Sequence, residues 1–198
     1  EEAVHQEALA ASDATPHVDA ARDRRAQQQF RHRIAASRLV VPEHRIIEID
    51  STLEEQGVLF ALAATAYHAV FAEGARRPDL IVGHGVLGRL IARMANTVEG
   101  PAPVVWESNA ERRTGASGYD VIDPSSDERR DYKSIYDVSG DAGLLDTLIG
   151  RLGRGGEITL AGFYHAPLSF AFPPAFMREA RIRIASEWTD GDLVAVRR

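Results

Sequence analysis

Three glycines form the pattern G-x-G-x-x-G at Gly83, Gly85 and Gly88, directly after the apolar run 80–82. Between a strand and a helix, the first glycine permits a tight turn and the second lets the backbone approach a pyrophosphate. The third lets the helix and strand pack closely, and the amides at the helix start can bind phosphate oxygens. We therefore expect a phosphate-binding loop made of Gly83, His84, Gly85, Val86, Leu87 and Gly88.

A carboxylate, Glu107, lies about 20 residues beyond the loop, at the end of a second apolar run, 104–106. In this place a carboxylate accepts a hydrogen bond from a ribose hydroxyl and repels a 2′-phosphate. Together with the glycines it predicts a dinucleotide cofactor, and NAD in preference to NADP. Arg112 and Arg113 are the alternative, because an arginine there could receive a 2′-phosphate. We favour a solvated helix start for both arginines.

Two other interpretations of the glycine pattern stay open. A tight turn that binds no ligand has the same glycines. A methyltransferase that binds S-adenosylmethionine has a similar strand, loop and helix, but the acidic residue expected just before the first glycine is not present at Val82.

Two further turns belong to the same expected site. In a doubly wound sheet, ligands bind beyond the carboxyl ends of the strands. Ser139 and Gly162 each follow a strand-like run, so we expect their backbone to lie at the nicotinamide side of the cofactor.

His165 is the best acid/base candidate in this region, although no catalytic residue is assigned. The seven histidines form no HxH or HExxH motif, so we expect no metal site.

Composition limits the function classes. The chain has 198 residues with 44% hydrophobic content, enough for one packed domain. Its net charge of −6 and the lack of a basic stripe argue against nucleic acid as a partner. It contains no cysteine, which excludes disulfides and thiolate metal sites. The longest apolar run, 58–72, is too short to span a bilayer, and from the opening Glu1-Glu2 we expect no signal peptide. We expect a cytoplasmic protein with no membrane span.

The elements that must position these residues alternate between strand and helix. Strands are expected at 79–83, 103–107, 119–122, 134–138, 157–162 and 181–186. Helices are expected at 86–97, 109–116, 141–153 and 173–178, and from about 190, and the helix 141–153 should end at a Gly155-Gly156 turn. This alternation predicts an α/β fold, a doubly wound parallel sheet with right-handed crossovers. The segment FAFPPAFM at 170–177 is expected to pack in the core, with a contact surface as the alternative.

The region before the alternation divides into two parts. Residues 1–34 are rich in Ala, Arg, Gln and charge, so we expect disorder or a loosely docked helix. In residues 35–75, strands are expected at 38–42 and 45–49, and Ser51 or Thr52 should cap a helix that begins at Leu53. A longer helix is expected at 58–73. The cofactor-binding domain then covers 76–198.

Several stretches resemble known families. The run from ASRLVVPEHRIIEID to PDLIVGHGVLG is similar to the join between the two domains of medium-chain dehydrogenases. More narrowly, VVWESNAERR, GYDVIDP, RRDYKSIYDVSGDAGLLDTLIGRL, GGEITLAGFY and FAFPPAFMREARIRIASEW resemble bacteriochlorophyllide a dehydrogenases over about residues 35–198.

The resemblance implies oxidation of the 3-(1-hydroxyethyl) group of a chlorin or bacteriochlorin to 3-acetyl, with NAD as acceptor. It also implies a homodimer, and identifies residues 35–75 as a remnant of a preceding GroES-like catalytic domain. That domain has no counterpart in residues 1–34, so its catalytic residues have no positions here. Two alternatives remain: a non-catalytic NAD-binding or dimerisation module, and a fragment of another medium-chain alcohol or polyol dehydrogenase.

Overall fold

The computed structural model describes residues 40, 42 and 46–197 of the chain. Residues from Ile47 onward form one compact unit, which is the unit described below. It includes the helix at 60–71 as well as the residues of the expected cofactor domain. The first 34 residues, for which disorder or a docked helix was predicted, lie outside the described part.

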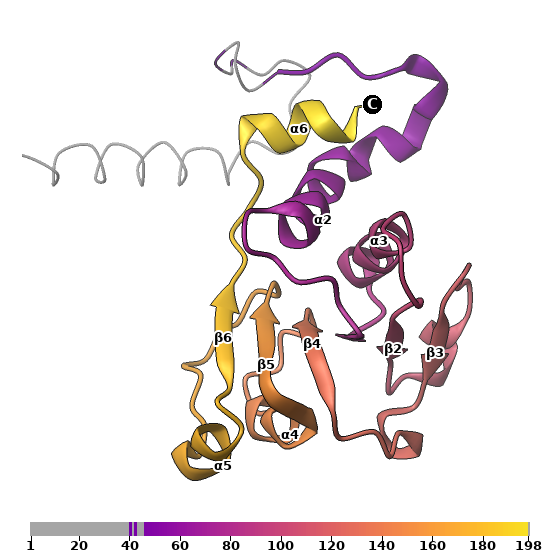
Figure 1. Cartoon of the computed structure of the whole chain (residues 1–198). Helices are drawn as coiled ribbons and strands as arrows, with labels where there is room; N and C mark the ends of the chain where they lie inside the picture. The colour runs from indigo at the N-terminus through magenta and orange to yellow at the C-terminus, as the bar shows by residue number, and fades with distance from the viewer. Residues whose placement is uncertain (1–39, 41, 43–45, 198) are drawn as a thin grey trace, which may run out of the picture. The chain divides into compact units, whose positions relative to one another are not determined.

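Six parallel strands form one sheet in the order β3-β2-β1-β4-β5-β6 (Figure 1). On its two sides, Leu80 of β1 is in register with Val104 and Ile135. The chain therefore builds outward from β1 in both directions, and the topological switch point lies between β1 and β4. This confirms the predicted doubly wound parallel sheet. The strands are Leu80–Val82 (β1), Val104–Trp106 (β2), Asp120–Ile122 (β3), Tyr132–Asp137 (β4), Leu152–Leu160 (β5) and Arg181–Ile184 (β6).

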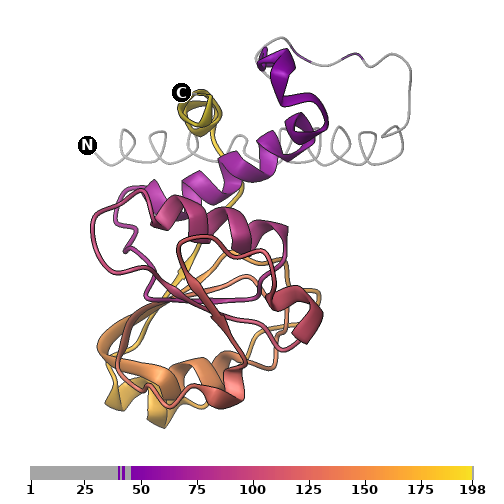
Figure 2. The ribbon, with the colours of Figure 1, turned by 90° about the vertical axis from the view of Figure 1, so that its right-hand side faces the viewer.

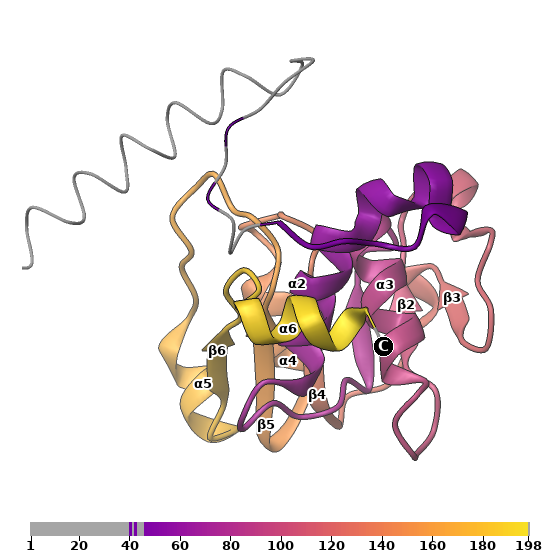
Figure 3. The ribbon, with the colours of Figure 1, turned by 90° about the horizontal axis from the view of Figure 1, so that it is seen from above.

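Helices cover both faces of this sheet, as the two perpendicular views show (Figures 1 and 2). On one side, α2 (Phe60–Phe71) and α3 (Val86–Ala95) pack against the sheet and against each other, and α6 (Asp190–Val196) lies on α2, farther from the strands (Figures 1 and 3). The other side holds α4 (Leu145–Arg151) and α5 (Phe172–Met177). Three short 3₁₀ helices, η2 (Ser51–Leu59), η3 (Ala110–Arg113) and η4 (Pro124–Ser126), lie in the connections.

Strand β1 shows how the sequence produces this layering. Leu80 and Val82 pack in a core cluster with α4 and α5, whereas Ile81 packs in a second cluster with α2 and α3. Side chains alternate between the faces of a strand, and both faces of a parallel sheet are covered. All three residues are therefore buried, which explains why the strand is continuously apolar.

The glycine pair before the fifth strand behaves differently from the prediction. Gly155 and Gly156 do not form a turn between a helix and a strand, because β5 already begins at Leu152 and runs through both. Gly155 has a φ of +70° and its amide donates to the carbonyl of Arg178. The pairing of β4 with β5 shifts register at Tyr132/Ser134. Glycines inside a strand often mark such an irregularity.

The segment before α2 also differs from expectation. The strand predicted at 45–49 is wrong over 46–49, where the backbone is outside any strand; Val40 and Pro42, the described residues of the strand predicted at 38–42, are outside strands as well. The next helix is a 3₁₀ helix, and its cap is Asp50 rather than Ser51 or Thr52. The Asp50 carboxylate accepts from the amide of Thr52 at 2.8 Å and from the Thr52 hydroxyl at 2.7 Å.

Candidate cofactor-binding site

A cleft of about 400 Å³ opens at the carboxyl ends of β1, β2 and β4, next to the topological switch point. This is where ligands bind in open α/β sheets. Its walls come from the turn after β1, the end of β2, η4, the turn after β4 and the start of α4. The lining residues are Val82, Gly83, Gly85, Trp106, Glu107, Ser108, Arg112, Pro124, Val138, Ser139, Asp141, Leu144 and Thr147.

The three glycines of the loop differ in what a side chain at each position would meet. Gly83 has a φ of +106°, and a Cβ there would lie 3.3 Å from the backbone of Ser139. A Cβ on Gly88 would lie 2.0 Å from the carbonyl oxygen of Gly83, so only glycine lets α3 start so close to β1. A Cβ on Gly85 would meet no described atom within 4 Å. Gly83 and Gly88 are therefore needed by the fold, whereas Gly85 leaves open space at the cleft.

The start of α3 faces this open space. Gly85 is its N-cap residue, with extended backbone, and no side chain of the described residues caps the helix. The first amides of a helix have no partner within the helix and carry its positive dipole end. The loop thus presents donors where a phosphate group would lie.

Glu107 is a buried carboxylate at the end of β2. Its Oε2 accepts from the amide of His84 at 3.2 Å, and its Oε1 accepts from the amide of Asn109 at 2.8 Å and from Arg112 at 3.3 Å. Burial acts to raise the pKa of Glu107, but these two amides and the guanidinium of Arg112 outweigh it and lower the pKa. Glu107 is therefore ionised at neutral pH. A carboxylate offers about four acceptor sites, so these three bonds leave room for a further donor.

Both arginines that follow Glu107 are engaged by carboxylates. Arg112 is exposed at the cleft rim beside Glu107, and Arg113 pairs with Asp123 at 2.9 Å. They lie in η3, a single 3₁₀ turn at the surface.

His84 has a side chain that is buried rather than free in the loop. Its Nδ1 lies 2.6 Å from the carbonyl oxygen of Arg112, and its Nε2 lies 2.9 Å from the hydroxyl of Tyr119. A carbonyl only accepts, so Nδ1 carries the proton and Nε2 accepts from Tyr119. Burial lowers the pKa of His84, which keeps the ring neutral. The imidazole thus ties the glycine loop to η3, a role that the sequence pattern does not show.

The two turns predicted for the nicotinamide side pack against each other. A Cβ on Gly162 would lie 3.2 Å from the Cα of Val138, and the amide of Gly162 donates to the carbonyl of Asp137. The Asp137 carboxylate accepts from the hydroxyl of Ser139 at 2.7 Å, and Tyr164 donates to the Asp137 carbonyl at 3.1 Å. Burial raises the pKa of Asp137 against these hydrogen bonds.

The structure distributes the predicted site residues unequally. Gly83, Gly85, Glu107 and Ser139 line the cleft. The loop residues His84, Val86, Leu87 and Gly88, and also Gly162, lie beside it without lining it. Sequence reasoning missed Trp106, Leu144 and Thr147 as wall residues; Trp106 could have been noticed because it directly precedes Glu107, whereas the other two depend on where α4 begins.

Other candidates carry no site of their own. His165 is exposed, and its ring packs edge-on against Phe163 at a centroid distance of 5.4 Å. Within residues 40, 42 and 46–197, no three histidine or acidic side chains gather as metal ligands. Over the same residues, no helix is long and apolar enough to cross a membrane.

Comparison with known proteins points in one direction. No family model matches the chain. It is 60% identical over 163 residues to the 2-desacetyl-2-hydroxyethyl bacteriochlorophyllide A dehydrogenase of Cereibacter sphaeroides, and 56% identical over 163 residues to that of Rhodobacter capsulatus. Each match covers 82% of this chain, but only 51% and 52% of the relatives. The chain thus spans about half the length of the curated relatives it matches.

Solved structures agree on the fold. L-Idonate 5-dehydrogenase of Escherichia coli matches with a TM-score of 0.67 at 19% identity, over 80% of this chain and 49% of that one. A protein of Sinorhizobium meliloti described as a zinc-binding dehydrogenase, solved with NADP, gives 0.66 over 80% and 52% at 19% identity. An alcohol dehydrogenase of Escherichia coli with NADH gives 0.65 over 80% and 51% at 18% identity. The chain is therefore a homologue of about half of a bacteriochlorophyllide a dehydrogenase, with the fold that medium-chain dehydrogenases share.

Proposed function

We propose that this chain binds NAD in the cleft described above, as the cofactor-binding part of a dehydrogenase. The whole enzyme would oxidise the 3-(1-hydroxyethyl) group of a chlorophyllide or bacteriochlorophyllide to 3-acetyl. Bound NAD⁺ would accept a hydride from the carbinol carbon, while the hydroxyl proton goes to a base. The names of the two homologues support the substrate class.

One observation carries the cofactor proposal: Gly85 holds open space at the uncapped start of α3, directly beside the ionised carboxylate of Glu107. The phosphates of a dinucleotide fit the first feature, and a ribose diol fits the second. A glycine turn without a ligand requires Gly83 and Gly88, but it does not require empty space above Gly85.

The choice of NAD over NADP rests on Glu107. A 2′-phosphate would lie against a buried, ionised carboxylate, and like charges in such a place repel strongly. Arg112 acts in the opposite sense, since it is exposed at the same rim, but its guanidinium is already paired with Glu107. The comparisons leave both cofactors open, because one neighbour was solved with NADP and another with NADH.

This chain, which matches about half of its relatives' length, should be a poor catalyst by itself. Orienting reactants can lower a barrier by roughly 7–11 kcal/mol, and closing a second domain over the substrate supplies much of that orientation. The test is to incubate the chain with NAD⁺ and a 3-(1-hydroxyethyl) chlorin and to follow the absorbance of the 3-acetyl product. Turnover on the order of 1 per second or faster would show that the part of the relatives that this chain does not match is not needed. NAD binding without any turnover, even with the relatives' remaining half supplied, would favour a non-catalytic module.

We also infer a homodimer, for which the α5–β6 face offers the surface. Contrary to the predicted core packing, the side chains of Phe172, Phe176 and Met177 are exposed, and they line a shallow apolar hollow of about 570 Å³. Beside it, Ile184 is 69% exposed on β6, whose outer edge pairs with no strand of the described residues. Exposed apolar patches next to an open strand edge are typical of interfaces. Light scattering of the purified chain tests this association.

A further inference from the structure

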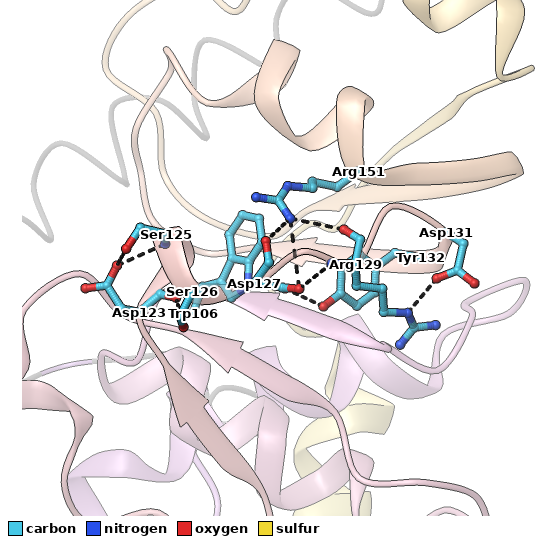
Figure 4. A network of polar contacts seen from close by, with 9 residues as sticks. All are labelled: Trp106, Asp123, Ser125, Ser126, Asp127, Arg129, Asp131, Tyr132 and Arg151. Atoms are coloured by element: carbon cyan, nitrogen blue, oxygen red, sulfur yellow. Dashed lines mark hydrogen bonds and ion pairs between the residues drawn. The ribbon is translucent and has the colours of Figure 1, made fainter.

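A buried carboxylate behind the cleft, Asp127, is bonded from three sides (Figure 4). Its Oδ2 accepts from the indole N–H of Trp106 at 2.7 Å and from the hydroxyl of Tyr132 at 2.5 Å. Its Oδ1 accepts from the amide of Arg129 at 2.8 Å. Burial acts to raise the pKa of Asp127, but these hydrogen bonds outweigh it and lower the pKa, so the group is charged at neutral pH.

Arg151, at the end of α4, holds the same indole from its face. Its guanidinium carbon lies 5.0 Å from the centroid of the Trp106 ring, and its Nη1 lies 3.9 Å from the Asp127 carboxylate. Arg151 also donates to the backbone carbonyls of Asp127 and Arg129. Replacing such a buried ion pair by apolar residues is often neutral or stabilising in proteins. Stability alone is therefore a weak explanation for this network.

Trp106, whose indole the network holds, is also tied to the glycine loop. The carbonyl of Trp106 accepts from the amide of Gly83 at 2.8 Å, and the next residue, Glu107, accepts from the amide of His84. Trp106 itself lines the cleft. The residue whose side chain the network holds is thus joined through its backbone to the first glycine of the loop and directly precedes the carboxylate beside it.

We propose that Asp127 is a positioning residue of the cofactor cleft, which acts through Trp106 to fix the end of β2 against the glycine loop and so orients Glu107. The inference rests on the proposed cofactor binding. It assigns to a residue from the loop before β4 a part in the site that the glycine pattern does not include.

The experiment compares Asp127→Asn with Tyr132→Phe, a matched control that removes another hydrogen bond from the same carboxylate without touching Trp106. NADH affinity is measured by calorimetry, and the free energy of unfolding by urea. Placing the variants in a Trp188→Phe background leaves Trp106 as the only tryptophan, so that its emission reports on the indole and its quenching reports on NADH. We expect Asp127→Asn to raise the Kd for NADH roughly tenfold, because the indole N–H then bonds a neutral amide oxygen in place of a charged carboxylate and is held less firmly.

Tyr132→Phe should change the Kd by less than about twofold even where the two variants lose similar stability. In a Trp106→Phe background, which lacks the indole N–H, Asp127→Asn should weaken NADH binding no further. Equal weakening by Asp127→Asn and Tyr132→Phe, or an undiminished effect of Asp127→Asn without the indole, would overturn the positioning role. If Asp127→Asn does not fold, Trp106→Phe tests the same link, and unchanged affinity there overturns it. Absence of NADH binding by the wild type would instead overturn the proposed cofactor role, and this inference with it.

Discussion

The cleft at the carboxyl ends of β1, β2 and β4 and the face formed by α5 and β6 are both open surfaces, but they are built in opposite ways. At the cleft, polar side chains are held in place by hydrogen bonds: the Glu107 carboxylate accepts from three donors, and the His84 ring has two partners. On the α5–β6 face, the exposed side chains Phe172, Phe176 and Ile184 are apolar. At its rim, Arg154 pairs with Glu179 at 2.6 Å.

This difference indicates two kinds of ligand. Restrained polar groups around a small cleft suit a small, charged molecule whose orientation matters. A broad apolar surface beside an open strand edge suits another protein surface, for which area and shape matter more than single hydrogen bonds. The comparison is testable, because variants on one surface should leave the function of the other unchanged.

The largest expected effect is loss of cofactor binding by Gly85→Val. A branched side chain would fill the space at the start of α3, while the φ of −72° at this position suits any residue. We expect the Kd for NADH to rise at least roughly 100-fold, about 2.8 kcal/mol, with a free energy of unfolding close to that of the wild type. Calorimetry and urea unfolding measure the two quantities.

Gly88→Ala is the contrast within the same loop. Its Cβ would lie 2.0 Å from the carbonyl of Gly83, so this variant should lose stability by about 1–3 kcal/mol or more. Equal NADH affinity of the wild type and Gly85→Val would contradict the phosphate-loop assignment, whatever Gly88→Ala does.

The next effect concerns the choice of cofactor. Glu107→Ala removes the carboxylate that would bond the ribose diol, and it releases Arg112 to meet a 2′-phosphate. We expect the preference for NADH over NADPH to fall by about tenfold to 100-fold, in line with a charged hydrogen bond worth about 1.5–3 kcal/mol. Competition titrations with both nucleotides measure it. Wild-type chain that binds NADPH as tightly as NADH would show that Glu107 does not face the ribose.

The glycine loop and Glu107 could be recognised in the sequence, whereas the buried residues packed behind them could not, for a physical reason. Gly83, Gly85 and Gly88 act within one turn, and Glu107 lies at a spacing set by one helix and one strand, so both can be recognised locally. The contact between Trp106 and Asp127 depends instead on how η4 and β4 pack behind β2. The burial of His84 depends on Tyr119, the residue before β3, whose hydroxyl hydrogen-bonds to the His84 ring.

The same limit explains the errors outside the cleft. Gly155 was predicted to end a helix, because a glycine pair after an apolar run is typical of a turn. In the structure its positive φ is used inside β5, where its amide bonds to Arg178, a residue that follows α5. The apolar segment at 170–177 was predicted to be buried, and hydrophobicity alone does not tell a core from an interface.

A smaller effect is expected on the α5–β6 face. Ile184→Lys places a charge on the exposed side of the edge strand, where a second copy would have to bury it. We expect the dissociation constant of the dimer to rise roughly tenfold, while the NADH affinity stays unchanged. Light scattering across a concentration series measures the association. A wild-type chain that is monomeric at every concentration, or a variant that loses NADH binding, would contradict the separation of the two surfaces.

The smallest expected effect is the pH dependence of stability that the cleft adds. The pKa of Glu107 is lowered from 4.5 and that of Asp127 from 3.8, so each group holds its proton less tightly when folded. A lowered folded-state pKa contributes stability that is present above the unfolded value and is lost as the pH falls through the folded value. Between pH 5 and pH 8 these two groups should therefore leave the free energy of unfolding constant, and below about pH 4.5 they should make it fall.

Glu107→Gln keeps the shape of the side chain but cannot titrate, and it loses the charge that Arg112 and the two amides stabilise. We expect this variant to be about 1 kcal/mol less stable at pH 7 and less sensitive to acid, so that the two curves approach each other as the pH falls below about 4.5. Urea unfolding at stepped pH measures the difference, with Ile184→Lys as the control that should run parallel to the wild type. Parallel curves for Glu107→Gln and the wild type would mean that the Glu107 carboxylate is not held in its charged form by the glycine loop, which would weaken the case for a ribose acceptor at this position.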